Sequence, residues 1–104
     1  MAKQMYLEFP VKTKHAEDFS DLCNSSLGFT LTKKQPGFIS AEWMISTSEN
    51  GKKYFHLWEK WESEEHFTAY MRTPERKAGS KFEISLRKWG DGDTKVFWGN
   101  VNLV

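Results

Sequence analysis

The sequence predicts an α+β fold, in which four antiparallel strands form one sheet and helices cover one of its faces. Apolar and polar side chains alternate in four separate segments, and alternation is the period of a half-buried strand. Apolar residues recur instead at helical spacing between the first and second of these segments and between the third and fourth. Strands and helices therefore follow one another in the order strand, helix, strand, strand, helix, strand.

The first strand is expected over residues 5–11. From residue 13 the apolar spacing becomes helical and continues to residue 31, and Pro36-Gly37 ends that segment. The polar run at 24–26 and Gly28 are poor helix formers, so we expect a kink or a break there.

Two strands follow, at residues 38–47 and 53–61, joined by the polar residues 48–51. Ser63 is expected to cap a helix whose first turn is acidic, and Thr73-Pro74-Glu75 is expected to start a second helix. The run 90–93 ends that helix, and the last strand is expected over 94–103. This order is the ferredoxin-like βαββαβ plan, a four-stranded antiparallel sheet with helices on one face, here with an extra helix in the second crossover.

Composition limits the classes of function. The 104 residues fit a single domain, 1–104, and the formal net charge of +1 argues against nucleic acid and membrane partners. Cys23 is the sole cysteine, so neither an internal disulfide nor a cysteine-based metal site is expected. No apolar core of a signal peptide is found near the N-terminus, and we expect a cytoplasmic protein.

Strand alternation assigns side chains to the two faces of the sheet. The face expected to carry the helices holds Met5, Leu7, Phe9, Ile39, Ala41, Trp43, Ile45, Phe55, Leu57, Trp61, Phe97, Val101 and Leu103, with Glu59 as its charged member. The other face holds Tyr6, Glu8, Ser40, Glu42, Met44, Tyr54, His56, Trp58, Lys60, Val96, Trp98, Asn100 and Asn102. The second face is too aromatic for plain solvent exposure, so we expect a homodimer through Tyr54, His56, Trp58 and Trp98. For both strands of the hairpin to keep these faces, the turn near residue 50 must contain three or five residues, or a bulge.

Pro36-Gly37-Phe38 leads into a strand, a later strand ends in LWEKW at 57–61, the helix start ESEEHFTAY follows at 62–70, and Thr73-Pro74-Glu75 comes next. With these motifs the segment 36–81 resembles the antibiotic biosynthesis monooxygenase (ABM) family. The resemblance implies a dimeric α+β barrel with a pocket between sheet and helices in each subunit. It also implies oxidation of phenolic or quinol rings by molecular oxygen without an added cofactor, or, in one branch, haem degradation.

The resemblance assigns candidate site residues. Trp61 matches a tryptophan of the haem branch, but the histidine ligand of that branch aligns with Ser80 and its asparagine with Leu7, so haem degradation is disfavoured. In the polyketide-oxidising branch, an asparagine position aligns with Leu57, and Lys81 is the nearest cation to a downstream arginine. We expect Trp61 and Glu59 to be catalytic, with a small aromatic molecule held by Trp43, Phe55, Leu57, Phe67, Met71 and Lys81.

Each assignment has an alternative. Trp61 is either a pocket wall or a core residue packed on Phe67. Glu59 in mid-strand is a general base with a raised pKa, the partner of Lys81 or Arg76, or a side chain that reaches solvent near the end of its strand. The run 75–77 is expected to be a solvated helix face. His56, if it lies near Glu8 and Glu42, belongs either to a metal or acid–base group or to a polar cluster in the dimer interface.

Three functions follow from these alternatives. The leading one is a cofactor-independent monooxygenase acting on a small aromatic, phenolic or quinol compound. The second is a non-catalytic dimeric protein that binds a small ligand or a partner. The third is isomerase or lyase chemistry based on Glu59 or His56. No metal is expected.

Overall fold

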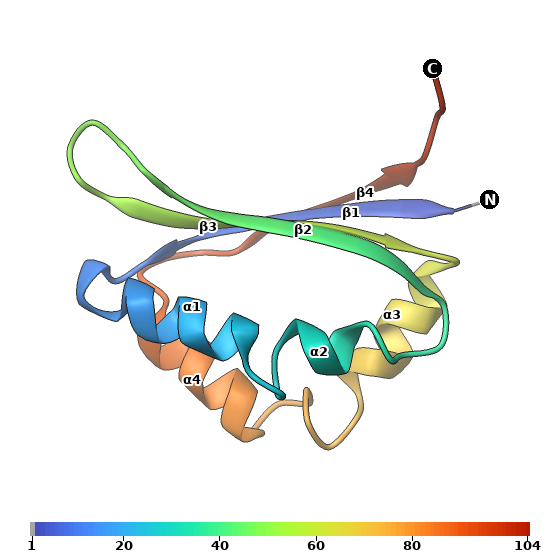
Figure 1. The fold of residues 1–104 in the computed structure, drawn as a ribbon, viewed down its shortest axis with the longest axis horizontal. Coiled ribbons are helices and arrows are strands. Elements are labelled where there is room, and N and C mark those ends of the chain that lie inside the picture. Colours follow the sequence, from blue (N-terminus) through green and yellow to red (C-terminus); the bar gives the residue numbers. More distant parts are fainter. Residues whose placement is uncertain (1) are drawn as a thin grey trace.

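A computed structural model describes residues 2–104, and its centre is a four-stranded antiparallel sheet. The strands are β1 (Lys3–Val11), β2 (Phe38–Thr47), β3 (Lys53–Trp61) and β4 (Lys95–Asn100), in the spatial order β2-β3-β1-β4. All the helices lie on one face, and the C-terminal end of the chain rises on the other side of the sheet (Figure 1). The predicted ferredoxin-like α+β fold is confirmed.

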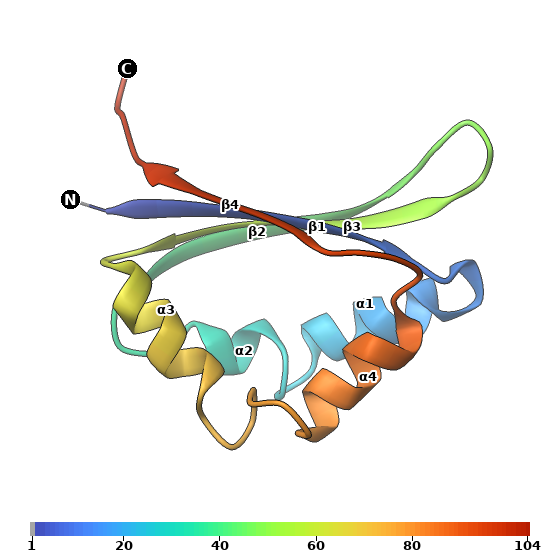
Figure 2. The ribbon, with the colours of Figure 1, turned by 180° about the vertical axis from the view of Figure 1, so that it is seen from behind.

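The helical layer contains a short 3-10 helix, η1 (Thr13–His15), and four α-helices, α1 (Ala16–Asn24), α2 (Phe29–Thr32), α3 (Glu64–Met71) and α4 (Lys81–Trp89). Figure 2 shows α3 and α4 from behind, joined by an irregular segment. The break expected after residue 24 is present between α1 and α2. It depends on Gly28, because a Cβ there would lie 2.2 Å from the carbonyl oxygen of Cys23.

The start of α4 differs from the expectation. Turns occupy residues 73–80, so the helix predicted from Thr73-Pro74-Glu75 begins only at Lys81. Gly79 has a φ of +87°, a left-handed conformation that interrupts helical growth. Ser80 then caps the new helix, since its Oγ accepts a hydrogen bond from the Glu83 main-chain N–H at 3.1 Å.

The hairpin between β2 and β3 has the predicted parity. Thr47 pairs with Lys53, and the five residues 48–52 connect them. Trp43 is therefore opposite Leu57 in the register, and both strands present the expected faces over most of their length. A register shift at Phe38–Ser40 is the exception, and it leaves Ile39 47% exposed.

The faces predicted for β4 are wrong. Pairing with β1 puts Phe97 opposite Tyr6 and Trp98 opposite Met5. Phe97 consequently stacks on Tyr6 on the open face, with ring centroids 6.3 Å apart, whereas Trp98 packs edge-on against Phe67 on the helix side at 5.3 Å. Trp98 thus does not belong to the open face. The strand also ends at Asn100 and not at 103, so Val101 and Leu103 lie beyond it.

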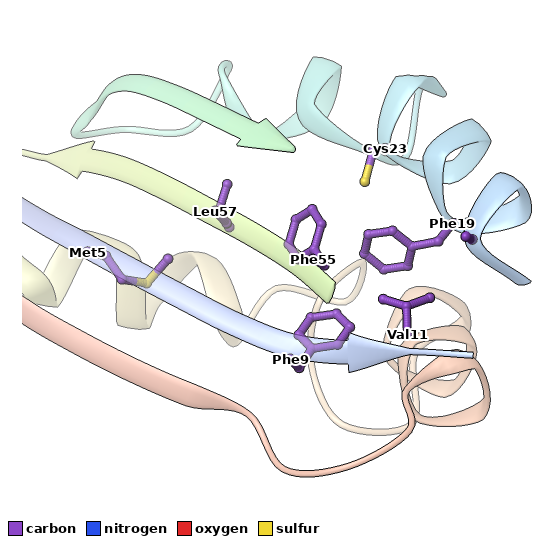
Figure 3. Packing of buried hydrophobic residues seen from close by; sticks show 8 residues of the cluster. Met5, Phe9, Val11, Phe19, Cys23, Phe55 and Leu57 are labelled. Atoms are coloured by element: carbon purple, nitrogen blue, oxygen red, sulfur yellow. The ribbon is translucent and has the colours of Figure 1, made fainter. Parts of the chain in front are cut away.

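The core lies between the sheet and α1. Phe9 of β1, Phe55 of β3 and Phe19 of α1 form an aromatic triad, with ring centroids 4.7 to 5.6 Å apart. Figure 3 shows these rings facing one another, with Cys23 pointing into the same space. Burying such rings stabilises the contact between α1 and the sheet by about 1.5–3 kcal/mol for each side chain. Among residues 2–104, no helix has the length and apolar character needed to cross a membrane.

Candidate active site

A cavity of about 100 Å³ lies between the sheet and the helices. Its wall is mostly apolar and comes from both the sheet strands and the helices. The lining residues are Met5, Leu7, Phe9, Phe19, Cys23, Gly28, Phe29, Thr32, Phe55, Leu57, Glu59, Phe67, Tyr70, Met71, Arg76, Phe82 and Leu86. Met71 is the most exposed of them, at 39%, and marks the edge of the cavity.

Five of the eight residues predicted for catalysis and substrate binding line this cavity. They are Phe55, Leu57, Phe67, Met71 and Glu59. Lys81 does not, because the later start of α4 makes it the first helical residue, where it is exposed. The predicted cationic handle is therefore wrong at Lys81.

The two predicted tryptophans lie behind the cavity wall. Trp43 is half-buried and stacks on Phe29, with ring centroids 6.1 Å apart. Trp61 is fully buried, and its ring packs edge-on against Phe67 at 5.7 Å. The indole N–H of Trp61 donates a hydrogen bond to Oε1 of Glu59 at 3.0 Å. Trp61 thus does not line the cavity itself, but it supports the lining residues Glu59, Phe67 and Tyr70 from behind.

Glu59 is the buried carboxyl group of the site. It is 3% exposed, because β3 is an inner strand and Glu59 faces the helices between Met5 of β1 and Ala41 of β2. Burial raises the pKa of Glu59 to about 7, although the Trp61 hydrogen bond and the positive charge of Arg76 oppose the rise. The group therefore changes its charge near neutral pH, a range that suits proton transfer.

Arg76 is the buried cation of the site. It is 4% exposed, donates a hydrogen bond to the carbonyl oxygen of Gly28 at 3.1 Å, and lies over the ring of Phe82 at 3.7 Å. Burial lowers its pKa, which Tyr70 and Glu59 partly counteract. The sequence interpretation placed Arg76 on a solvated helix face, which is wrong. No local pattern marks its burial, which arises because the turns at 73–80 fold back onto Gly28.

Two hydroxyl groups complete the polar part of the wall. The hydroxyls of Tyr70 and Thr32 are 2.7 Å apart, and that of Thr32 also donates to the carbonyl oxygen of Gly28 at 3.3 Å. Burial raises the pKa of Tyr70 and raises that of Cys23 to about 12. Both groups therefore stay neutral at physiological pH. The sequence interpretation named neither Tyr70 nor Thr32 as a site residue.

The open face of the sheet carries a separate polar and aromatic cluster around His56. Its Nδ1 lies 2.7 Å from the hydroxyl of Tyr6, and its Nε2 lies 2.8 Å from Oγ of Ser46. Glu8 is opposite His56 in the register, but Glu42 is opposite Trp58. Within residues 2–104, no three histidine, cysteine or carboxylate side chains gather as a metal site would require.

The match to known families covers most of the chain. The family model described as "Antibiotic biosynthesis monooxygenase" (ABM) matches residues 5–81, which include every lining residue except Phe82 and Leu86. The chain belongs to this family. Among curated proteins none matches this ABM chain.

Solved structures share the ABM fold. A conserved protein from Methanosarcina mazei Go1 aligns with a TM-score of 0.76 and 20% identity over 98% of this chain and 94% of the other. A candidate antibiotic biosynthesis monooxygenase from Caulobacter crescentus CB15 aligns with a TM-score of 0.79 and 15% identity over 98% of this chain and 91% of the other. Another, from Nitrosomonas europaea, aligns with a TM-score of 0.75 and 16% identity over 96% of this chain and 89% of the other. At these identities the likeness concerns the fold.

The positions that align with the haem branch of ABM proteins serve other purposes in this chain. Ser80, where the resemblance puts a histidine ligand, caps α4. Leu7, at the asparagine position, contributes apolar surface to the cavity. Within residues 2–104, no histidine is among the side chains that line the cavity. Within the described residues, the charged side chains in the cavity wall are those of Glu59 and Arg76.

Proposed function

We propose that this ABM protein is a cofactor-independent monooxygenase that oxidises a small aromatic, phenolic or quinol compound inside the cavity. The observation that carries the proposal is the position of Glu59. Its carboxyl group titrates near neutral pH and lies in an apolar cavity beside one cationic side chain. Family membership supplies the class of reaction.

Glu59 is the proposed general base. In its ionised form it takes the proton of a phenolic hydroxyl, and Arg76 stabilises the negative charge that forms on the ring oxygen. The electron-rich phenolate then reduces molecular oxygen. One oxygen atom forms a bond to the ring and becomes a quinone oxygen, and the other leaves as water, so the ring supplies all the electrons. Trp61 holds the carboxylate through its indole N–H.

The size of the cavity limits the substrate. Its volume of about 100 Å³ is below the roughly 300–1,000 Å³ of typical small-molecule pockets. An apolar cavity of about 150 Å³ nevertheless accommodates benzene. A single ring therefore needs only modest expansion, and Met71 at the edge is a flexible side chain that can move aside.

The open face of the sheet is proposed to pair with a second copy of the chain. Tyr6, His56 and Trp58 form a half-buried cluster there, with the exposed ring of Phe97 beside it. Sedimentation of the wild type and of Trp58→Arg tests the homodimer, and the variant is expected to be monomeric. A wild type that sediments as a monomer at every concentration would contradict the pairing. We also propose that the protein is located in the cytoplasm.

The alternative is a dimeric protein that binds a small ligand without chemistry. Two observations favour it, because Leu57 stands where an asparagine is expected from the resemblance, and Lys81 lies outside the cavity. Under this alternative the ligand saturates the cavity, but no oxygen is consumed.

Oxygen uptake distinguishes the two functions. Phenols, hydroquinones and catechols are supplied singly to the protein, and the rate without protein is subtracted. The wild type is expected to consume oxygen with substrate alone, and Glu59→Gln is expected to lower kcat by about 100-fold, the size of a general-base contribution. Glu49→Gln, in the exposed connection 48–52, is the matched control. Saturable binding without uptake for the whole panel would support the binding protein and refute the monooxygenase.

A further inference from the structure

Arg76 carries a buried positive charge that has no carboxylate partner within residues 2–104. Its acceptors are the main-chain carbonyl oxygens of Gly28 and Glu75, at 3.1 and 3.5 Å. Among residues 2–104, no carboxylate oxygen lies within 4.0 Å of the guanidinium nitrogens. Glu59 lines the same cavity, but it does not form an ion pair with Arg76 at that distance.

A buried charge without a counter-ion is costly in a protein interior. The rings of Phe82 and Tyr70, whose centroids lie 3.7 and 5.1 Å from the guanidinium carbon, offset part of this cost. An anion inside the cavity would remove the rest. The guanidinium therefore offers an unneutralised positive charge to a negatively charged group on a ligand that is otherwise apolar.

We propose that the cavity selects single-ring aromatic compounds that carry one acidic group. This group is a phenolic hydroxyl, an enol or a carboxylate, and it binds directly to Arg76 while it shares a single proton with Glu59. This inference rests on the cavity of the proposed function, and it specifies the class of substrate. Rings of the same size without an acidic group are rejected because they offer the guanidinium no oxygen atom that can accept its hydrogen bonds.

The shared proton follows from the charges that face the cavity. Arg76 contributes one positive charge, so one negative charge, on either Glu59 or the ligand, makes the site neutral. If both Glu59 and the ligand carry a proton, the positive charge of Arg76 is not neutralised. If neither carries a proton, two negative charges lie beside one positive charge. Tyr70 of α3 and Cys23 of α1 are the other titratable groups in the wall, and their raised pKa values keep them neutral. Glu75 is exposed and lies outside the lining.

The pH dependence of binding distinguishes the two kinds of ligand. The complex in which the ligand and Glu59 share one proton forms most readily at pH values between the pKa of the ligand and the pKa of Glu59. The pKa of Glu59 is about 7. A carboxylate ligand such as benzoate, with a pKa of about 4, binds best between about 4 and 7. Phenol, with a pKa of about 10, binds best between about 7 and 10.

Isothermal titration calorimetry with benzoate, phenol and toluene tests the proposal. Measurements at pH 6 and 8, in two buffers of different ionisation enthalpy, count the protons exchanged. Benzoate is expected to take up about one proton at pH 8 and to lose affinity about tenfold for each pH unit above 7. Phenol is expected to release about one proton at pH 6 and to exchange none at pH 8, and toluene is expected not to bind.

Two variants test the residues. Glu59→Gln keeps Arg76 but cannot ionise, so benzoate affinity is expected to become independent of pH above 7. Arg76→Gln, its fold checked by circular dichroism, is expected to lose benzoate binding, whereas Lys77→Gln on the exposed side of the same segment serves as the control.

Several results would overturn the proposal: equal affinity for toluene and phenol, a benzoate affinity in the wild type that does not depend on pH, or no binding of benzoate and phenol at all. The monooxygenase fails separately. If the binding pattern holds and no oxygen is consumed, the selectivity stands and the catalytic function does not.

Discussion

Replacing Glu59 by glutamine is expected to change how the stability of the protein depends on pH. Glutamine keeps the size of the side chain, and its oxygen can still accept the hydrogen bond from Trp61. It cannot ionise, however. The wild type must bury a carboxyl group whose pKa rises from 4.5 to about 7 on folding.

The sign and the size follow from proton linkage. Between pH 4.5 and 7 the folded wild type keeps a proton on Glu59 that the unfolded chain has lost, so the free energy of unfolding falls as pH rises. The contribution is fully present below pH 4.5 and is lost once the pH exceeds about 7. At about 1.4 kcal/mol for each pKa unit, the loss amounts to about 3 kcal/mol. Glu59→Gln removes this loss.

Urea denaturation of both proteins at equal concentration, at pH 4.5 and 8.5, measures the effect. The free energy of unfolding of Glu59→Gln relative to wild type should rise by about 3 kcal/mol between the two pH values. Other carboxyl and histidine groups titrate equally in both proteins and cancel in the difference. A difference that stays constant within about 0.5 kcal/mol would refute the buried, titrating carboxyl group and with it the proposed base.

Three further substitutions test local features, each by urea denaturation. Tyr70→Phe removes the hydrogen bond to Thr32 and should cost about 1 kcal/mol, so unchanged stability would deny that this bond contributes. Gly37→Ala should cost at least about 1–2 kcal/mol, because φ is +83° and the new Cβ would lie 2.3 Å from Cγ of His66; a neutral result would contradict the close approach. Ser63→Ala should cost about 1 kcal/mol by removing the cap of α3, whereas Ser63→Asp should restore most of it.

The strands could be predicted from the sequence wherever one face was clearly apolar. The bounds of β2 and β3 and an odd-numbered connection of three or five residues, or a bulge, followed from alternation, because a slip by one residue would have put Trp43 and Phe55 on the wrong face. In β4 both alternating sets contain large apolar and polar residues. No local pattern shows which of Phe97 and Trp98 points toward the helices. The pairing of β4 with β1 determines this.

The candidate site could be predicted only in part, for a related reason. Glu59 was found because a carboxyl group on the helix-facing side of a strand is unusual. Arg76 lies between Glu75 and Lys77, which are exposed, and this pattern is typical of a solvated helix. The burial of Arg76 depends on Gly79, which ends the turns before α4. It also depends on the carbonyl oxygen of Gly28, which is distant in the sequence and accepts a hydrogen bond from Arg76. Tertiary contacts of this kind leave no periodic signal in the chain.

The position of β1 in the sheet has a consequence for synthesis on the ribosome. The first strand to emerge lies between β3 and β4, with Lys3 opposite both Trp61 and Asn100. The β2–β3 hairpin can form early, since hairpins close within about 1–10 μs. One edge of β1 stays unpaired until β4 leaves the exit tunnel, and unpaired strand edges promote aggregation. A nascent chain that stalls before residue 95 would therefore expose an edge of β1 that the finished sheet covers with β4.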